Sequence, residues 1–356
     1  MNVLIFGGTG AMGAHITTLL AAKDVNVTVT SRKERVNKKN VSYVVGDAKD
    51  DAFFRKLCSK HWEAIIDFMV YTTEMLEARI ELLLESTDQY VFISSARVYA
   101  DIEGRIKEDS PRLLETSTDE EYLNTSEYAL EKAREENILI ASPKKNWTIV
   151  RPSLTYSEQR LQLGVYEKEN WLYRALHGRS IVFSIDLLDK YYTMSYGMDV
   201  SEGIAGLIGN TEAIGEIFHI VVDKEYQWKE ILEVYLATIE KKIGKRPKVV
   251  FTDVSTNLQI KNAKYQVLYG RYFNRKFDTS KIQSLVDTSE WVDAKVGLEK
   301  CLIKFLEEPK FLDINWAVEG LIDRAAHEWT PFSEIRGIKN KLIYIKYRLG
   351  IGVASF

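Results

Sequence analysis

Three side chains in the first half of the chain have the types and spacing needed to move a proton onto or off an oxygen atom. Tyr128 and Lys132 are four residues apart, so on a helix the ammonium lies beside the phenol. A free phenol titrates near pH ~10, and a neighbouring cation favours its ionised form. Proton transfer then becomes useful closer to neutral pH. Ser95 follows a predicted strand, and its hydroxyl can hold the oxygen that gains or loses the proton.

A glycine-rich turn, Gly7-Gly8-Thr9-Gly10-Ala11-Met12-Gly13, lies between a predicted strand and a predicted helix. Here Gly7 permits the tight turn, Gly10 lets a pyrophosphate approach the backbone, and Gly13 lets helix and strand pack closely. The N-terminus of the helix offers unpaired N–H groups to the phosphates. A purely structural turn is the alternative. Together with the three side chains, the turn predicts hydride transfer between a nicotinamide and an alcohol or ketone.

The end of the second predicted strand bears on which dinucleotide is bound. An acidic residue about 20 positions after the glycines would bind the ribose hydroxyls of NAD. This chain has Ser31-Arg32-Lys33 instead, which suits a 2′-phosphate. We therefore expect NADP(H), with NAD(H) possible if these residues form only a solvated basic turn. Asp47, after the third strand, is either a partner for the adenine amino group or a helix N-cap.

The first 150 residues alternate between short apolar runs and amphipathic segments, which predicts a Rossmann-like, doubly wound parallel sheet. The predicted strands are 2–6, 25–30, 41–45, 64–70, 90–94 and 147–150, and the helices are 14–22, 75–85 and 127–141. We place a first domain at 1–155 and a smaller C-terminal α/β domain mainly at 156–308. Elements near 187–222 are expected to return to the first domain. The acidic segment 101–121 is predicted to be a surface loop approaching the active site.

Composition narrows the classes of function. A net charge of −3 offers no general attraction to nucleic acid, so no nucleic-acid partner is expected. The two cysteines are too few for a disulfide framework and favour a reduced, cytoplasmic compartment. The five histidines lie far apart without ligand spacing, so no metal site is predicted. No nucleophile-elbow pattern surrounds a serine, and no apolar run is long enough to span a bilayer.

From residue 2 to about residue 308 the chain resembles extended short-chain dehydrogenases/reductases of the nucleotide-sugar epimerase/dehydratase group. The segments that carry the resemblance, in order, are the glycine turn, Asp47, Ser94-Ser95-Ala96-Arg97-Val98-Tyr99, Tyr128-Ala129-Leu130-Glu131-Lys132, Arg151-Pro152-Ser153, Met198-Asp199-Val200-Ser201-Glu202-Gly203-Ile204-Ala205 and Phe277-Asp278-Thr279-Ser280-Lys281. No single short match is decisive, but the ordered set is specific. It implies a Rossmann-like cofactor domain and a C-terminal domain that binds a nucleotide-activated sugar.

The resemblance also implies roles for individual residues. Tyr128 is the general acid/base, Ser95 orients the substrate oxygen, and Lys132 stabilises the phenolate and holds the nicotinamide ribose. Ser95 is preferred to Ser94 because it precedes Tyr99 by four positions. The implied cofactor contacts are Gly7, Thr9, Gly10, Ala11, Met12, Gly13, Ser31, Arg32, Lys33, Asp47, Ala48, Lys132 and Pro152. A homodimer through the helices at 75–85 and 127–141 is implied as well.

Departures from the family pattern narrow the chemistry. Dehydratases of the family carry an acidic pair directly after the catalytic hydroxyl residue, whereas this chain has Ala96-Arg97, so 4,6-dehydration is not expected. Arg97 cannot donate a proton at neutral pH and is a candidate contact for a substrate phosphate or carboxylate. Tyr71 and Ser153 are further candidate substrate contacts. The segment Asp67-Phe68-Met69-Val70-Tyr71 replaces the small, Ala-rich turn that the family usually has near the nicotinamide.

The basic turn favours a reductase over an epimerase. An epimerase oxidises a sugar carbon and returns the hydride to its other face, so tightly held NAD suits it. A reductase consumes a reduced cofactor at every turnover, and cellular NADPH is kept reduced. We therefore expect an NADP(H)-dependent reductase acting on a keto group of a nucleotide-activated sugar, as in polysaccharide precursor synthesis. An NAD-dependent epimerase is the alternative, followed by a non-catalytic dinucleotide sensor.

Residues 309–356 form an extension beyond the region of resemblance. Ile335, Ile338, Leu342, Ile345 and Leu349 recur at spacings of three and four, which predicts an amphipathic helix with an apolar stripe. Lysines and arginines line its remaining faces. We expect the helix to dock on its own domain or on a partner subunit. Contact of 333–356 with an anionic membrane surface is the alternative.

Overall fold

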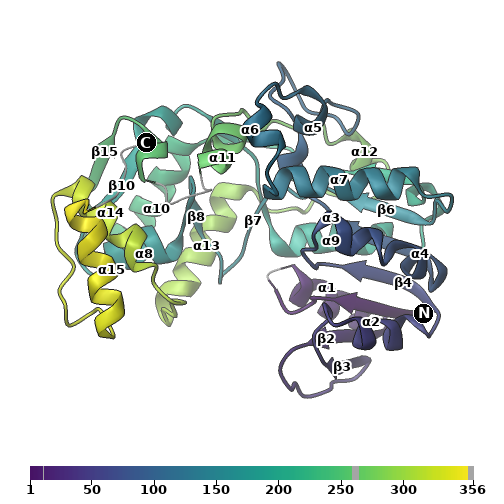
Figure 1. Ribbon diagram of the computed structural model, residues 1–356. Coiled ribbons are helices and arrows are strands. Elements are labelled where there is room, and N and C mark those ends of the chain that lie inside the picture. The colour runs from purple at the N-terminus through teal and green to yellow at the C-terminus, as the bar shows by residue number, and fades with distance from the viewer. Residues whose placement is uncertain (11, 259–263, 352–356) are drawn as a thin grey trace. The chain divides into compact units, whose positions relative to one another are not determined.

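The computed structural model describes residues 1–10, 12–258 and 264–351 of the chain (Figure 1). It divides into two compact units that are each discontinuous in sequence. Unit 1 comprises Met1–Thr155, Thr193–Lys224 and Lys276–Ala294. Unit 2 comprises Tyr156–Tyr192, Glu225–Arg275 and Lys295–Phe356.

A seven-stranded sheet forms the centre of unit 1, in the order β13-β6-β5-β4-β1-β2-β3. Its strands are β1 (Asn2–Phe6), β2 (Asn26–Ser31), β3 (Val41–Val45), β4 (Trp62–Asp67), β5 (Thr87–Ile93), β6 (Trp147–Val150) and β13 (Glu216–Phe218). Every neighbouring pair is parallel. This confirms the predicted Rossmann-like, doubly wound sheet. β13 joins its edge from a distant part of the chain.

Helices cover both faces of this sheet, which explains its nearly continuous apolar strands. One face packs against α1 (Gly13–Ala22), α9 (Gly197–Leu207) and α12 (Ser280–Gln283), and the other against α2 (Asp51–Cys58), α3 (Thr73–Glu77), α4 (Ile80–Glu85) and α7 (Tyr128–Ala141). Along β1, Val3 and Ile5 enter the first core, whereas Leu4 and Phe6 enter the second. Alternation along a single strand therefore supplies both cores.

The strand order reverses between β1 and β4, and this reversal indicates where a ligand site is expected. In open α/β sheets ligands bind outside the carboxyl ends of the strands at such a switch point. The glycine turn follows β1, and the departing segment 67–71 begins at the end of β4. Ser95 follows β5. The topology therefore brings these segments to one edge of the sheet.

The predicted helix at 75–85 is two helices, α3 and α4, and Arg79 explains the break. The Arg79 side chain is buried, and its guanidinium donates to the carbonyl oxygens of Ala48 and Lys49 at 2.8 and 2.6 Å. It also pairs with Asp51 at 2.5 Å. These partners lie about thirty residues earlier in the chain, so helical periodicity gave no sign of them.

Short helices occupy the acidic segment that was expected to be a loop. It contains α5 (Leu113–Thr116) and α6 (Glu120–Leu123), and the short 3₁₀ helix η1 (Ala96–Val98) precedes it. The remaining short elements near unit 1 are β7 (Leu154–Tyr156), β12 (Met194–Tyr196) and η3 (Thr211–Ala213).

Unit 2 combines short strand pairs with longer helices. The pairs are β8 (Gln162–Leu163) with β9 (Tyr166–Glu167), β10 (Ile181–Ser184) with β15 (Val249–Thr252), and β11 (Tyr191–Tyr192) with β14 (Tyr226–Gln227). The main helices are α8 (Lys168–Leu176), α10 (Trp228–Ile243), α13 (Ala294–Glu307), α14 (Trp316–Ala326) and α15 (Ile338–Leu349), and the smaller pieces are η2 (Ile185–Leu187), η4 (Ser255–Leu258), α11 (Lys264–Gln266) and η5 (Val267–Arg271). Among the described residues, no helix is both long and apolar enough to cross a bilayer.

The C-terminal helix docks on its own unit, but not through the predicted apolar stripe. α15 packs along α14, where a Cβ on Gly320 would lie only 2.7 Å from the Tyr344 carbonyl oxygen. Tyr344 is buried in this contact, whereas Ile338 and Leu342 of the stripe are exposed. The prediction that the helix docks on its own domain is therefore confirmed, but the contact is made by a tyrosine on another face; Ile335 of the stripe, which precedes α15, is also buried.

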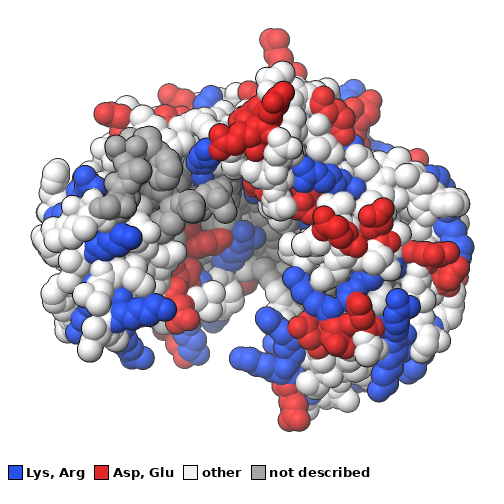
Figure 2. All heavy atoms as spheres, in the orientation of Figure 1, with Lys and Arg blue, Asp and Glu red and all other residues white. Residues whose placement is uncertain are grey.

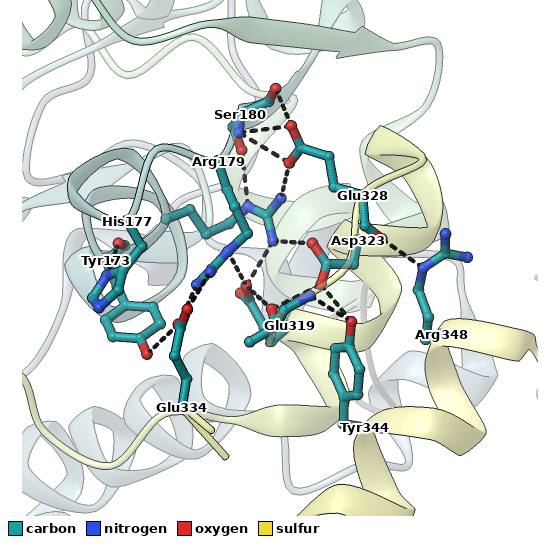
Figure 3. A network of polar contacts seen from close by, with 12 residues as sticks. Tyr173, His177, Arg179, Ser180, Glu319, Asp323, Glu328, Glu334, Tyr344 and Arg348 are labelled. Carbon is teal, nitrogen blue, oxygen red and sulfur yellow. Dashed lines mark hydrogen bonds and ion pairs between the residues drawn. The ribbon is translucent and has the colours of Figure 1, made fainter. Parts of the chain in front are cut away.

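A buried ionic network ties α14 and α15 to α8 (Figure 3). The Arg174 guanidinium, with no exposed surface, lies 2.7 Å from both the Glu319 and the Asp323 carboxylates, which are also fully buried. A third contact, at 2.7 Å, reaches Glu328. Burial would raise the pKa of Asp323, but the Arg174 charge holds it below its usual value. The Tyr344 hydroxyl donates to Asp323 at 2.7 Å and so fixes α15 to the network.

We expect Arg174→Met to lower the free energy of unfolding by about 3 kcal/mol, because it leaves Asp323 buried without its cation and leaves Glu319 with the longer, 3.4 Å contact to Arg179. Urea denaturation at neutral pH measures this loss. The loss should shrink in mildly acidic buffer, since an unpaired buried carboxyl group takes up a proton. The matched control is Arg246→Met, which removes half-exposed pairs with Glu233 and Glu240 and should cost about 0.5 kcal/mol or less. Equal losses from the two variants would contradict the structural role of the network.

Candidate active site

The glycine turn after β1 has the geometry of a phosphate-binding turn. Gly7 has a φ of +69°, which side chains rarely allow. A Cβ on Gly13 would lie 2.5 Å from the Gly8 Cα, so α1 can approach the turn only with glycine there. A Cβ on Gly10, in contrast, would meet nothing within 4 Å. The backbone at Gly10 is therefore open to a ligand, and the residues present fit a dinucleotide pyrophosphate.

The start of α1 is consistent with anion binding. Met12 is its N-cap and forms no side-chain cap bond, while the Ala14 N–H of the first turn already donates to the Gly10 carbonyl oxygen at 3.0 Å. Thr9 and Gly10 are exposed beside this N-cap. Ala11, also predicted to contact the cofactor, lies outside the described residues.

The basic turn after β2 contains one cation more than the sequence prediction used. Arg32 and Lys33 are exposed. The Ser31 hydroxyl is occupied locally, since it donates to the Lys33 carbonyl oxygen at 2.7 Å. The Arg35 side chain donates to the same hydroxyl at 3.3 Å and stacks on Tyr43. Arg35 thus belongs to this turn, and its position four residues after Ser31 was the signal that the prediction overlooked.

The structure bears on the two roles considered for Asp47, a contact to adenine and a helix N-cap. The N-cap of α2 is Asp50, whose carboxylate accepts the Phe53 N–H at 2.8 Å. Asp47 is exposed and accepts the Lys49 N–H at 2.9 Å. The N-cap reading is therefore wrong, and the adenine contact stays a prediction. Ala48 is buried, and its carbonyl oxygen already accepts from Arg79.

The three predicted catalytic residues sit on two adjoining elements. Ser95 is the N-cap of η1, and Tyr128 is the first residue of α7. η1 packs against α7. Tyr128 is 36% exposed, whereas Lys132, one turn further along, is 2% exposed. The helix therefore presents the phenol to solvent and keeps the ammonium in the interior.

Lys132 lies among groups that the sequence prediction did not assign. Its ammonium donates to the Glu135 carboxylate at 2.8 Å and lies 4.5 Å from the centre of the Phe92 ring. Burial raises the pKa of Glu135 to about 7, although the Lys132 charge acts in the opposite direction. Glu135 thus changes charge near neutral pH, directly beside the predicted catalytic lysine.

A second buried carboxylate, Asp67, ends β4 close by in the same unit. It accepts hydrogen bonds from the Tyr71 and Tyr90 hydroxyls at 2.9 and 3.0 Å and from the Met69 N–H at 2.9 Å. Burial raises the pKa of Asp67, while these hydrogen bonds favour its ionised form. Tyr71 is 3% exposed in this network, which argues against its predicted contact with substrate.

The other predicted contacts are already paired within unit 1. Arg97 pairs with Glu127 at 2.5 Å, and its guanidinium lies 5.7 Å from the centre of the Tyr128 ring. Its charge is therefore largely balanced, although its position beside Tyr128 keeps it near the predicted reaction. The Ser153 hydroxyl donates to the Thr193 carbonyl oxygen at 2.9 Å, and the Pro152 carbonyl oxygen accepts the Ala96 N–H at 2.9 Å.

Comparison with known proteins agrees with this architecture. The chain belongs to the NAD dependent epimerase/dehydratase family, whose model matches residues 3–220. This confirms the predicted resemblance. No curated protein matches the chain.

Solved structures show the same fold at low sequence identity. Epimerase Mth375 from Methanothermobacter thermautotrophicus is 17% identical, with a TM-score of 0.64 over 86% of this chain and 92% of that one. UDP-glucuronic acid 4-epimerase from Bacillus cereus, in complex with UDP-glucuronic acid and NAD, is 16% identical, with a TM-score of 0.63 over 86% and 99%. WbmH from Bordetella bronchiseptica, in complex with NAD⁺, is 15% identical, with a TM-score of 0.65 over 87% and 99%.

The glycine turn predicts opposite outcomes for two alanine substitutions. Gly13→Ala places a Cβ against the Gly8 backbone, so we expect a clear loss of thermal stability. Gly10→Ala places its Cβ in open space, so the fold should keep its stability while dinucleotide binding weakens about tenfold or more. Thermal unfolding and fluorescence titration with NADPH and NADH measure the two effects. Unchanged dinucleotide affinity in Gly10→Ala would rule out this turn as the pyrophosphate site.

Proposed function

We propose that the protein is an oxidoreductase that reduces a keto group on a nucleotide-activated sugar, with Tyr128 as the general acid. The observation that carries the proposal is the arrangement on α7 and η1. An exposed phenol begins the helix, a buried ammonium follows one turn later, and Ser95 caps the element packed beside them. Ser95 follows the carboxyl end of β5, and the open glycine turn follows that of β1.

The residues present divide the work of such a reduction. A bound nicotinamide dinucleotide supplies the hydride. The turn at Gly10 and the start of α1 would hold its pyrophosphate, and Lys132 its nicotinamide ribose. The Ser95 hydroxyl donates a hydrogen bond to the carbonyl oxygen of the substrate. Tyr128 gives that oxygen its proton as the carbon gains the hydride, so that the ketone becomes an alcohol.

The net charge of the Lys132–Glu135 pair determines how strongly the Tyr128 phenolate is stabilised. The Lys132 ammonium stabilises the phenolate that remains after proton donation. An ionised Glu135, 2.8 Å from that ammonium, partly neutralises its positive charge. A protonated Glu135 is uncharged, so the full positive charge of Lys132 then acts on the phenolate. We infer that Glu135 acts on the reaction through Lys132 rather than by touching the substrate.

The cofactor distinguishes the two candidate functions, because a reductase would use NADP(H) and an epimerase NAD. In the turn after β2 the exposed cations Arg32, Lys33 and Arg35 outnumber the one exposed carboxylate, Glu34, and β2 itself ends at Ser31 rather than at an acidic residue; this supports NADP(H) and hence a reductase. The second candidate is an NAD-dependent epimerase, which the NAD complexes of the structural neighbours favour. With either chemistry we propose a cytoplasmic homodimer, formed through α3, α4 and α7, the helices of the predicted segments 75–85 and 127–141. Binding of the nucleotide sugar by 156–308 stays a prediction.

Tyr128→Phe removes only the phenolic hydroxyl of an exposed side chain, so the fold should persist. We expect turnover with keto nucleotide sugars to fall by about 100-fold or more, because the general acid is lost. Dinucleotide affinity should change little. NADPH consumption and fluorescence titration measure these two quantities. Substantial activity in the variant would overturn the assignment of Tyr128.

The basic turn predicts cofactor preference. After a check of the purified protein for retained dinucleotide, NADPH should titrate more tightly than NADH. Replacement of Arg32 and Lys33 by glutamine should weaken NADPH about tenfold or more and leave NADH nearly unchanged. The control is the same exchange at Lys56 and Lys60, two exposed lysines elsewhere in unit 1. Tightly retained NAD, with no effect of Arg32 and Lys33, would favour the epimerase.

A further inference from the structure

The C-terminal helix α15 is held in one orientation by contacts on one of its faces. The Tyr344 hydroxyl donates to Asp323 at 2.7 Å and accepts the Thr330 N–H at 2.8 Å (Figure 3). The Arg348 side chain donates to the Glu328 carbonyl oxygen at 2.7 Å. Because Asp323 belongs to the buried Arg174 network, the helix is fixed to the core of unit 2. Its outward face is therefore a preformed surface.

That outward face carries an apolar ridge. Ile338, Leu342 and Leu349 are 78%, 63% and 53% exposed. With about 100° of rotation per residue, these three side chains fall on one line along the helix, at least about 120° away from Tyr344, and the partly buried Ile345 lies on the side of that line nearer to Tyr344. Monomeric proteins normally bury such a row, so its exposure on a firmly docked helix calls for a partner.

Cations flank the ridge on both sides. The same helical rotation places Lys339 and Lys346 along one edge and Lys341 along the other, whereas Arg348 lies nearer the docked face and donates to the Glu328 carbonyl oxygen. From residue 335 to residue 351 the sequence contains no aspartate or glutamate, although the whole chain has a net charge of −3. Figure 2 shows Lys and Arg side chains among uncharged surface where α15 lies in Figure 1. The cations of this helix are thus not offset by any acidic residue of the same segment.

We propose that α15 docks the protein on an anionic phospholipid surface. Aliphatic side chains with lysines on both sides match the chemistry of an interfacial helix, which lies in the membrane plane at the level of the head groups. The aliphatic ridge enters the boundary with the acyl chains. The flanking lysines keep their charges at the phosphates while their methylene stems cover apolar surface.

The charges beside the ridge favour an anionic lipid surface, rather than a second copy of this chain, as the partner of α15. Two copies meeting ridge to ridge would bring the three flanking lysines of one helix against the three of the other, with no acidic residue on either helix to pair with them. An anionic bilayer instead complements both edges of the ridge at once. Trp329, which is 52% exposed and lies 4.5 Å from the Arg348 guanidinium, adds an aromatic ring of the kind found at membrane interfaces.

Sedimentation of the full chain with vesicles tests the proposal. The vesicles contain phosphatidylcholine alone, or phosphatidylcholine with about one-third phosphatidylserine. We expect binding only to the anionic vesicles, and weaker binding as salt is raised. The variant Ile338→Ser with Leu342→Ser removes the ridge, and Lys339→Glu with Lys346→Glu reverses one edge. Each should weaken binding by roughly tenfold or more.

Matched control variants distinguish specific binding through α15 from non-specific binding of the protein to vesicles. Leu312→Ser removes another aliphatic side chain of unit 2 that is 76% exposed, and Lys242→Glu with Lys245→Glu makes the same charge change at exposed positions. Both should bind like the unaltered chain. Binding that is absent, equal on neutral vesicles, or equally weakened by the controls would overturn the proposal. Self-association abolished by the ridge variant, without vesicle binding, would also overturn it and identify a second copy as the occupant.

Discussion

The placement of the candidate active site depends on one buried ion pair, between Glu136 and Arg151. The Arg151 guanidinium contacts both oxygens of the Glu136 carboxylate, at 2.8 and 2.7 Å, and Arg112 adds a third contact at 2.8 Å. The Ser94 hydroxyl donates to the same carboxylate at 2.5 Å. Burial would raise the pKa of Glu136, but the Arg151 charge holds it below its usual range. The group therefore stays ionised, and its removal would leave a guanidinium buried without its partner.

This pair fixes α7 against the ends of two strands. Arg151 follows β6, and Ser94 follows β5 directly before Ser95. Glu136 lies one turn after Lys132 and about two turns after Tyr128, so fixing its carboxylate also fixes their rotation about the helix axis. Ser95 and Tyr128 are thereby positioned through the same carboxylate. Catalytic groups need such support, because small displacements of a reacting group are costly.

The features that could be predicted from the sequence are those that depend on local residue patterns. The parallel sheet followed from continuous apolar strands, and the glycine turn from its place between strand and helix. The break at Arg79, the pairing of Arg97 with Glu127 and the role of Glu136 depend on partners about 15 to 40 residues away, which periodicity does not contain. Glu135 could have been found, because it lies three residues after Lys132 on a predicted helix. The tail was predicted as an amphipathic helix, but its docked face depends on Tyr344 and Gly320, not on the stripe.

The two units use buried arginines in the same way. In unit 1 the Arg151 contacts hold one side of α7, so that Tyr128 at its start is left exposed. In unit 2 the Arg174 network holds α14 and, through Tyr344, one side of α15, so that the ridge at Leu342 is left exposed. A helix held only by its apolar stripe would have to bury that stripe. In α7 the ionic contacts add to a buried apolar face that includes Leu130 and Leu139. In α15 polar contacts on another face do the anchoring, so this helix can present its apolar ridge to its surroundings.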